Sequence, residues 1–237
     1  MSLIELEEYE ADPNSGLRGD NYPDDSIRAR SRQPVGGVAK RSLDLAICLV
    51  LIPLFLPLFV GLCLLVKLTD PGPIFFGHKR VGFEGRTFKC WKFRTMVTNG
   101  DELLRKHFAA HPHDLAIWMA ERKLPQDPRV TVIGVVLRKL SLDEIPQIIN
   151  VINGEMSLVG PRPVVKDELD NYARSTGYYL KARPGVTGAW QVSGRSDTSY
   201  RDRVKLDRYY ISNWTLVLDF WILVRTLPAV LKARGAR

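Results

Sequence analysis

Two adjacent carboxylates, Asp143 and Glu144, have the types and spacing best suited to chemistry in this sequence. Arg138 shortly precedes them, and a Gly-Pro-Arg-Pro turn containing Arg162 follows about five helical turns later. An acid can attack a phosphorus atom or hold a metal ion, and guanidinium groups bind the resulting anion well. The arrangement therefore suggests chemistry on a phosphate.

The same stretch also has a purely structural interpretation. Ser141 and Glu144 have the spacing of a capping box, in which each side chain bonds the other residue's backbone N–H. Asp143 in the first turn would then only favour the helix dipole. Pro146 predicts a bent helix start because it removes a backbone hydrogen bond. The spacing leaves the catalytic and the structural interpretation open.

The composition is that of a basic, foldable chain. Of its 237 residues, 34 are Lys or Arg against 26 Asp or Glu, and 45% are hydrophobic. Such a charge balance suits nucleic acid, a membrane surface or phosphorylated substrates, but no basic helix or aromatic platform supports nucleic acid. Cys48, Cys63 and Cys90 show no CxxC spacing, which predicts thiols of a reducing compartment.

Residues 45–66 contain no charged side chain and predict a membrane-inserted helix, roughly 33 Å long. Lys40 and Arg41 precede this run and further basic residues follow it, so the positive-inside rule predicts both ends in the cytoplasm. Pro53 and Pro57 each predict a kink. A re-entrant helix hairpin satisfies both signals, and a spanning helix with proline kinks is the alternative.

The chain is thus expected to have three regions. A disordered, apolar-poor tail without a secretory signal is expected over 1–36, and the re-entrant helix over 37–69. A cytoplasmic catalytic domain is expected over 70–237. Its fold class is predicted as α+β, mostly helical, with short strands at 74–76 and 87–93 around a glycine turn. Helices are expected at 101–123, 143–151, 167–181, 202–212 and 214–231, the last being interfacial or part of the core.

Four further arginines are candidate phosphate ligands. Arg94 ends the second strand, although a lone arginine there is more often solvated. Arg129 lies in an Asp-Pro-Arg turn. Arg183 and Arg195 lie in glycine-containing loops that could approach a nucleotide closely, and simple turns explain those glycines about as well.

Several motifs in order give the chain a resemblance to the bacterial sugar transferases, the monotopic phosphoglycosyl transferases that start exopolysaccharide and O-antigen repeat units. The resemblance extends from about residue 37 to residue 234, and the short form is most similar to the galactosyl-phosphate transferases of succinoglycan-type synthesis. The matching motifs are Lys-Arg-Ser-Leu-Asp (40–44), Lys-Phe-Arg-Thr-Met (92–96), Asp-Pro-Arg (127–129), Leu-Arg-Lys-Leu-Ser-Leu-Asp-Glu-Ile-Pro-Gln (137–147), Gly-Glu-Met-Ser-Leu-Val-Gly-Pro-Arg-Pro (154–163) and Arg-Pro-Gly-Val-Thr-Gly (183–188).

The resemblance implies transfer of a sugar-1-phosphate from a UDP-sugar to undecaprenyl phosphate, with release of UMP. It implies that Asp143 is the nucleophile, that Glu144 holds Mg²⁺, and that Arg138 and Arg162 lie near the phosphates. It also implies an active site on the cytoplasmic face of the bacterial inner membrane, in contact with membrane lipids. Downstream glycosyltransferases and a second copy of the chain are further conceivable partners. The family commonly has Ser-Pro at the helix break, whereas this chain has Leu56-Pro57, so the depth and angle of the hairpin stay open.

Two alternatives to this expectation remain at the sequence level. Within the family, a glucosyl-phosphate transferase is the alternative to a galactosyl-phosphate transferase. Outside enzymes, the basic charge and the apolar anchor would suit a non-catalytic membrane-anchored scaffold.

Overall fold

A computed structural model describes residues 33–121, 124–193 and 198–231. Most of the predicted N-terminal tail and Arg195 lie outside these residues. The described part is mostly helical, with two small two-stranded sheets, so the α+β prediction is confirmed.

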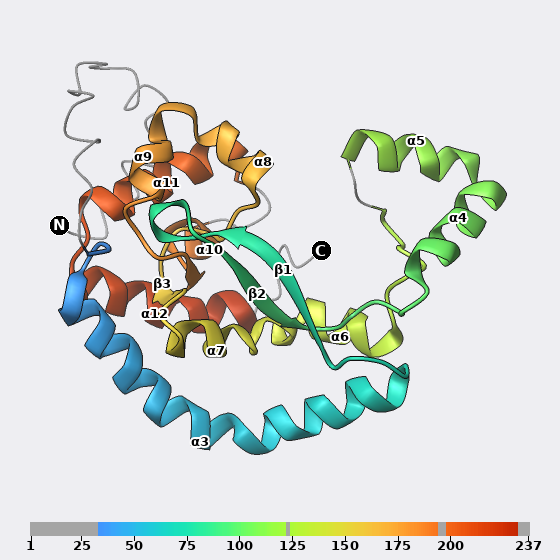
Figure 1. Cartoon of the computed structure of the whole chain (residues 1–237), viewed down its shortest axis with the longest axis horizontal. Coiled ribbons are helices and arrows are strands. Elements are labelled where there is room, and N and C mark those ends of the chain that lie inside the picture. The colour runs from blue at the N-terminus through green and yellow to red at the C-terminus, as the bar shows by residue number, and fades with distance from the viewer. Residues whose placement is uncertain (1–32, 122–123, 194–197, 232–237) are drawn as a thin grey trace.

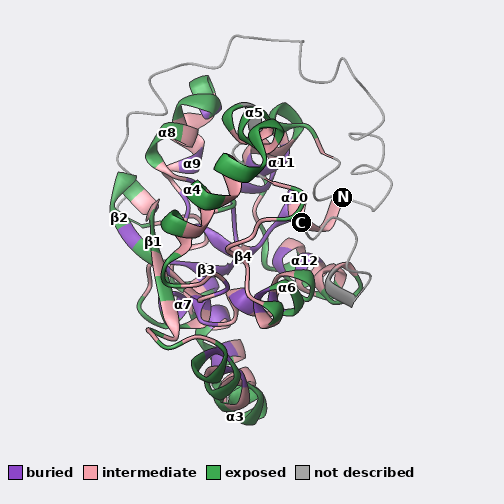
Figure 2. Cartoon of the chain, turned by 90° about the vertical axis from the view of Figure 1, so that its right-hand side faces the viewer, coloured by how far each residue is buried: buried purple, intermediate pink, exposed green. Residues whose placement is uncertain are grey.

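The membrane-helix candidate is α3, a single helix over Gly37–Thr69. Figure 1 shows it as a long arc whose ends meet the rest of the chain and whose middle lies furthest away. Pro53 and Pro57 lie in that middle, and each removes a helical hydrogen bond. The helix is long and apolar enough to cross a membrane. Most of its residues are exposed (Figure 2), so contacts within the domain do not account for its apolar character.

The predicted hairpin forms after this helix. Strands β1 (Phe75–Val81) and β2 (Thr87–Phe93) pair antiparallel, with Phe75 opposite Phe93 and Val81 opposite Thr87. The sequence predicted a first strand of only three residues because Gly77 and the charged residues after it weaken the apolar pattern. The backbone pairing with β2 extends that strand to Val81. Gly85 has a φ of 79°, which glycine adopts without a steric penalty in the turn.

The helical segments around the hairpin differ from the predictions in two places. The helix expected at 143–151 starts only at Gln147, because a 3₁₀ turn and Pro146 precede it, and the predicted bend at Pro146 is thereby confirmed. The single helix expected at 167–181 is three short segments, with Ala173 in a non-helical conformation. The helix is interrupted at Ala173, and buried side-chain hydrogen bonds hold the chain on both sides of the break. The Tyr172 hydroxyl donates to Asp207, and the Tyr179 hydroxyl donates to the Val81 carbonyl.

The helix expected at 101–123 is two helices, α4 (Gly100–Ala110) and α5 (Pro112–Glu121), whereas the helices expected at 202–212 and 214–231 are each present as one. Pro112 separates the first two, and they form an arm that projects from the rest of the chain (Figure 1). The bounds are α4 Gly100–Ala110, α5 Pro112–Glu121, α6 Val132–Lys139, η2 Leu142–Glu144, α7 Gln147–Ile152, α8 Lys166–Leu169, η3 Asp170–Ser175, α9 Thr176–Tyr179, α10 Ala189–Ser193, α11 Tyr200–Ser212 and α12 Leu216–Leu231.

A parallel pair of very short strands, which the sequence did not predict, lies at the centre of the domain. Strands β3 (Ser157–Val159) and β4 (Gly185–Thr187) pair next to the Gly-Pro-Arg-Pro turn. The backbones approach so closely that a Cβ on Gly160 would lie 2.5 Å from the Arg183 carbonyl oxygen. The main hydrophobic cluster surrounds this pair and includes Met156, Val159 and Tyr210. The glycines of both motifs therefore bring two loops together beside the predicted site.

Candidate active site

The two carboxylates lie on the short 3₁₀ turn η2, between α6 and α7. Ser141, immediately before them, adopts a left-handed conformation with a φ of 55° and makes no side-chain capping bond. Glu144 instead accepts a hydrogen bond from Lys92 Nζ at 2.6 Å. The capping-box interpretation is therefore wrong, because neither of its two side-chain bonds forms.

Lys92, on strand β2, joins the two acids. Its Nζ lies 2.6 Å from Glu144 Oε1 and 3.5 Å from Asp143 Oδ2. Lys92 belongs to the Lys-Phe-Arg-Thr-Met motif, of which only the arginine was predicted as a ligand. Side chains alternate between the two faces of a strand, and this alternation could have identified Lys92. One face of the hairpin carries Lys92, Cys90 and Arg80. All three line the cleft in front of Glu144.

The cleft also receives the arginine of the Gly-Pro-Arg-Pro turn. Arg162 lines it together with Gln147, and the Arg162 guanidinium lies 5.7 Å from the centre of the Trp190 ring. Arg80, on β1, makes a 3.5 Å ion pair with Glu168 at the edge of the cleft. Three cationic side chains therefore face one acidic turn. The full lining is Arg80, Cys90, Lys92, Glu144, Gln147, Arg162, Pro163, Gly185, Val186 and Gln191.

This charge pattern moves the pKa values of the two acids in opposite directions. Burial raises the pKa of Asp143; Lys92 opposes the rise and the neighbouring Glu144 charge adds to it. Burial would also raise the pKa of Glu144, but Lys92, Arg162 and Arg80 lower it below its ordinary value. Lys92 keeps a raised pKa despite burial because both carboxylates stabilise its charge. Two acids with separated pKa values are typical of acids that have different roles.

Arg138 lies in the last turn of α6. Its Nε donates to Thr95 Oγ1 at 2.9 Å, and burial lowers its pKa while Asp143 and Asp127 oppose that shift. Arg138 thus contributes positive charge near Asp143 without a direct ion pair to it among the described contacts.

The other arginines selected from the sequence are bound elsewhere. Arg94 pairs with Asp70 at 2.9 Å, where α3 ends. Arg129 binds Asp127 through two bonds of 2.8 and 2.6 Å. Arg183 donates to the Gly154 carbonyl at 2.8 Å. The structure does not bring these three into the cleft, and their role in binding substrate stays a prediction.

Comparison with known proteins gives a family for this arrangement. Residues 35–233 match the sequence profile of the family described as "Bacterial sugar transferase". The chain is 53% identical over 204 residues to the "Exopolysaccharide production protein ExoY" of Rhizobium meliloti, covering 86% of this chain and 90% of that protein. It is 51% identical over 197 residues to the "UDP-galactose-lipid carrier transferase" of Erwinia amylovora, covering 83% and 41%. It is 47% identical over 197 residues, with the same coverage, to the "Undecaprenyl-phosphate galactose phosphotransferase" of Salmonella typhimurium.

The chain belongs to the bacterial sugar transferase family. In this sugar transferase, the acidic turn and the Gly-Pro-Arg-Pro turn lie about twenty residues apart in sequence and meet in one cleft. Lys92 and Arg80 reach that cleft from a separate hairpin.

The donor set around Glu144 fits magnesium on chemical grounds. Mg²⁺ prefers oxygen ligands, and it commonly binds through one or two carboxylates together with substrate phosphates. Glu144 supplies such oxygens in a cationic cleft, and Asp143 is its neighbour on the same turn. Within residues 33–121, 124–193 and 198–231, no group of three or more His, Cys, Asp or Glu side chains forms a ready metal cage. The site therefore suits an ion that arrives with a phosphate ligand.

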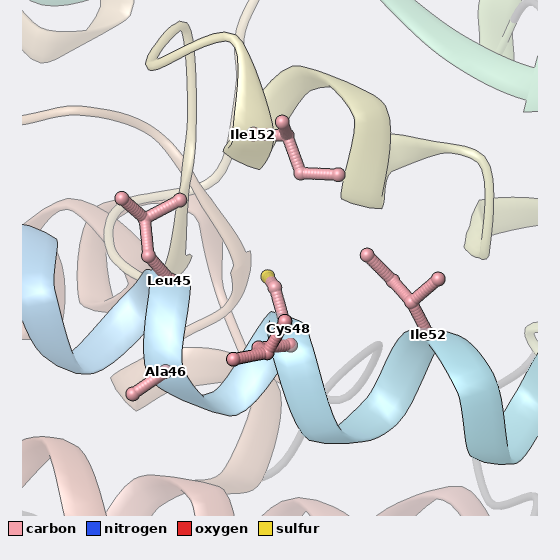
Figure 3. Close-up of a pocket in the computed structure, with 6 residues that line it drawn as sticks. Leu45, Ala46, Cys48, Ile52 and Ile152 are labelled. Atoms are coloured by element: carbon pink, nitrogen blue, oxygen red, sulfur yellow. The ribbon is translucent and has the colours of Figure 1, made fainter.

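This sugar transferase also has an apolar groove between α3 and α7. The groove has a volume of about 410 Å³ and opens to the outside (Figure 3). Ile152 faces it from α7, opposite Leu45, Cys48 and Ile52 of α3. Its full lining is Leu45, Ala46, Cys48, Leu49, Ile52 and Ile152.

Proposed function

We propose that this protein transfers a sugar-1-phosphate from a UDP-sugar to undecaprenyl phosphate and releases UMP, as the first step of an exopolysaccharide repeat unit. The names of its relatives support a lipid-carrier acceptor, and two of them name galactose. We therefore take galactose-1-phosphate as the transferred group and glucose-1-phosphate as the alternative. The observation that carries the proposal is that Glu144, Lys92 and Arg162 line one cleft and that Lys92 Nζ also lies 3.5 Å from the Asp143 carboxylate.

In the first step, an Asp143 oxygen attacks the phosphorus bonded to the sugar. The new Asp143–phosphorus bond forms as the phosphoanhydride bond breaks, and UMP leaves with the bridging oxygen. In the second step, a phosphate oxygen of undecaprenyl phosphate attacks the same phosphorus and releases Asp143. Covalent capture divides one transfer into two displacements, each with its own acceptor.

The cations of the cleft stabilise the charge that develops in both steps. Arg162 and Arg80 can offset charge on the diphosphate, as guanidinium groups do at phosphate sites. Lys92 favours the ionised form of Asp143 and so opposes the effect of burial on its pKa, because the charged form gains the nearby ammonium. Bound Mg²⁺ would be held by Glu144 and the donor phosphates, where it would neutralise negative charge.

We also propose that α3 re-enters the membrane and leaves the site at the cytoplasmic face of the inner membrane. Both ends of α3 contact the same domain: Lys40 pairs with Asp219 near one end, and Asp70, just past the other, pairs with Arg94. A helix that crossed the bilayer would place these ends on opposite sides. Exposed apolar side chains of α12, including Val217, Phe220 and Leu227, support seating on a lipid surface.

Cysteine labelling tests this topology. Single cysteines at positions near 36 and 70 should both resist a membrane-impermeant thiol reagent applied to intact cells. Labelling at just one of them would establish a spanning helix. Pro57→Ala should move some molecules to the spanning form, because it removes one cause of the bend.

The reaction is tested with purified protein, undecaprenyl phosphate and a panel of UDP-sugars, with UMP release as the signal. UDP-galactose should turn over fastest. Faster turnover of UDP-glucose would change the sugar and leave the reaction class intact. Absence of UMP with every donor would favour a non-catalytic membrane scaffold.

A further inference from the structure

The Lys-Arg-Ser-Leu-Asp motif at residues 40–44 has no place in the chemistry above, yet its charged side chains make long-range contacts. Lys40 Nζ forms a 2.6 Å ion pair with Asp219 of α12, and these side chains are only 6% and 2% exposed. Asp219 also accepts hydrogen bonds from Tyr210 at 2.6 Å and from Trp214 at 3.0 Å. The first turn of α3 is therefore fixed to the C-terminal helices.

Arg41 fixes the helix that follows the carboxylates. Its guanidinium donates to the carbonyl oxygens of Val151 and Ile152, the latter at 2.7 Å. These carbonyls lie at the C-terminal end of α7, where helix carbonyls lack intrahelical partners. Since α7 begins just after Glu144, a clamp on its far end restrains the acidic turn.

Asp44 fixes the strand that leads to Arg162. The Asp44 side chain is buried, and its Oδ1 accepts a hydrogen bond from the Leu158 N–H at 3.1 Å. Leu158 is the middle residue of β3, and Gly160-Pro161-Arg162 follows that strand directly. Asp44 and Arg41 lie on the same two turns of α3.

We propose that Arg41 and Asp44 are positioning residues that fix the acidic turn and Arg162 relative to each other. Both residues act from the first turns of the membrane helix α3. This inference rests on the proposed function. It differs from a simpler role for Arg41, in which any positive charge at this end of α3 would keep that end on the cytoplasmic side.

The substitution Arg41→Lys separates the two roles. Lysine keeps the positive charge but lacks the planar fork that reaches two carbonyls at once. We expect kcat to fall by about tenfold, because small misplacements of reacting groups are costly. The KM values for donor and acceptor should stay within about twofold, as expected when only the transition state is affected. Arg86→Lys is the matched control, because Arg86 lies on the hairpin turn with its side chain 80% exposed.

Asp44 offers a test with a conservative rescue. Asp44→Ala removes the acceptor for the Leu158 N–H and should lower kcat. Asp44→Asn keeps a carbonyl oxygen that can accept the same bond, so it should recover most of that loss. If Asp44→Ala fails to accumulate in membranes, Arg41→Lys and Asp44→Asn still decide the question.

Hydrogen exchange supplies a readout that does not depend on the reaction. In Arg41→Lys the amides of α7, and in Asp44→Ala the Leu158 amide, should exchange faster than in the unmodified protein, while α4 is unchanged. An unmodified protein that releases no UMP would overturn the proposed function, and exchange would then decide the inference alone. Full kcat in Arg41→Lys, a rise confined to the acceptor KM, or unchanged exchange in both variants would overturn the inference.

Discussion

The charged residues of this protein divide into two groups that look alike in the sequence. Arg94 pairs at 2.9 Å with Asp70, just past the end of α3, and Arg129 pairs at 2.6 Å with Asp127 in its own turn. Arg162 and Lys92 instead line one cleft together with Glu144, and Lys92 lies within 3.5 Å of both carboxylates of the acidic turn. A cation that is already paired with a single carboxylate has little positive charge available to bind a phosphate. Cations that surround one acidic turn can instead exchange partners when an anion binds. The contrast separates supporting arginines from those placed to act on a substrate.

The strongest test of the cleft is Asp143→Asn. The amide keeps the size of the side chain but is a far weaker nucleophile, so UMP release should fall by about 10³-fold or more. The variant should stay folded and membrane-bound, because it removes a partly buried charge without creating a cavity. Mass spectrometry of the unmodified enzyme with UDP-sugar and no acceptor should locate a sugar-phosphate adduct on Asp143. Substantial activity in Asp143→Asn would contradict the covalent route.

Lys92→Met gives the next largest effect. Methionine fills a similar volume without the charge that pairs with Glu144 at 2.6 Å. We expect kcat to fall by about 10²-fold, as when one electrostatic group of an active site is removed. The measurement is the kcat for UMP release at saturating donor and acceptor. Activity close to that of the unmodified protein would place Lys92 among the supporting cations.

Arg162→Lys should have a smaller effect, which falls on the donor. Lysine keeps the charge and loses the guanidinium plane that lies against Trp190 and can bind a phosphate through two bonds. The KM for the UDP-sugar should rise by about tenfold, which corresponds to a loss of about 1.4 kcal/mol of binding free energy. An unchanged donor KM would remove Arg162 from the donor site.

The pH dependence tests the interaction between the two acids. Burial raises the pKa of Asp143 above the ordinary value of 3.8, so the acid limb of kcat/KM should lie above that pH. At lower pH Asp143 is protonated and cannot attack. Glu144→Gln removes a like charge and should shift the limb to lower pH, whereas Lys92→Met removes an opposite charge and should shift it to higher pH. Shifts in the same direction would contradict the assignment.

The sequence predicted the parts of this site that are local. The acidic turn, the bend at Pro146 and the hairpin follow from residue types close together in the chain, and the structure contains all three. Arg162 was selected from its motif, and the structure places it in the cleft.

What the sequence could not give depends on contacts between distant residues. The pairing of Lys92 with Glu144 joins residues of β2 and η2, and nothing in either segment alone distinguishes it from a capping box. The β3–β4 pair likewise joins two strands too short to show a pattern. The kink at Ala173 arises where tertiary hydrogen bonds of two tyrosines override a helical sequence.

The smallest expected effect on activity belongs to Arg129→Lys. Arg129 holds Asp127 through its Nε and a terminal nitrogen, and its guanidinium lies 4.8 Å from the centre of the Trp118 ring. Burial alone would raise the pKa of Asp127, yet the bonds from Arg129 lower it, so this pair is bound tightly without a substrate. Lysine keeps the charge but loses both the fork and the stacking, which should cost about 1 kcal/mol of stability.

Thermal unfolding in detergent should therefore show a lower midpoint for Arg129→Lys, while kcat and the donor KM per folded molecule change little. Asp127→Asn is the matched variant, since it weakens the same pair from the other side and should lower the midpoint in the same way. A large rise in the donor KM with an unchanged midpoint would give the opposite result. It would mean that Arg129 leaves Asp127 to bind the UDP-sugar, and the division between supporting and acting arginines would have to be redrawn with Arg129 beside Arg162.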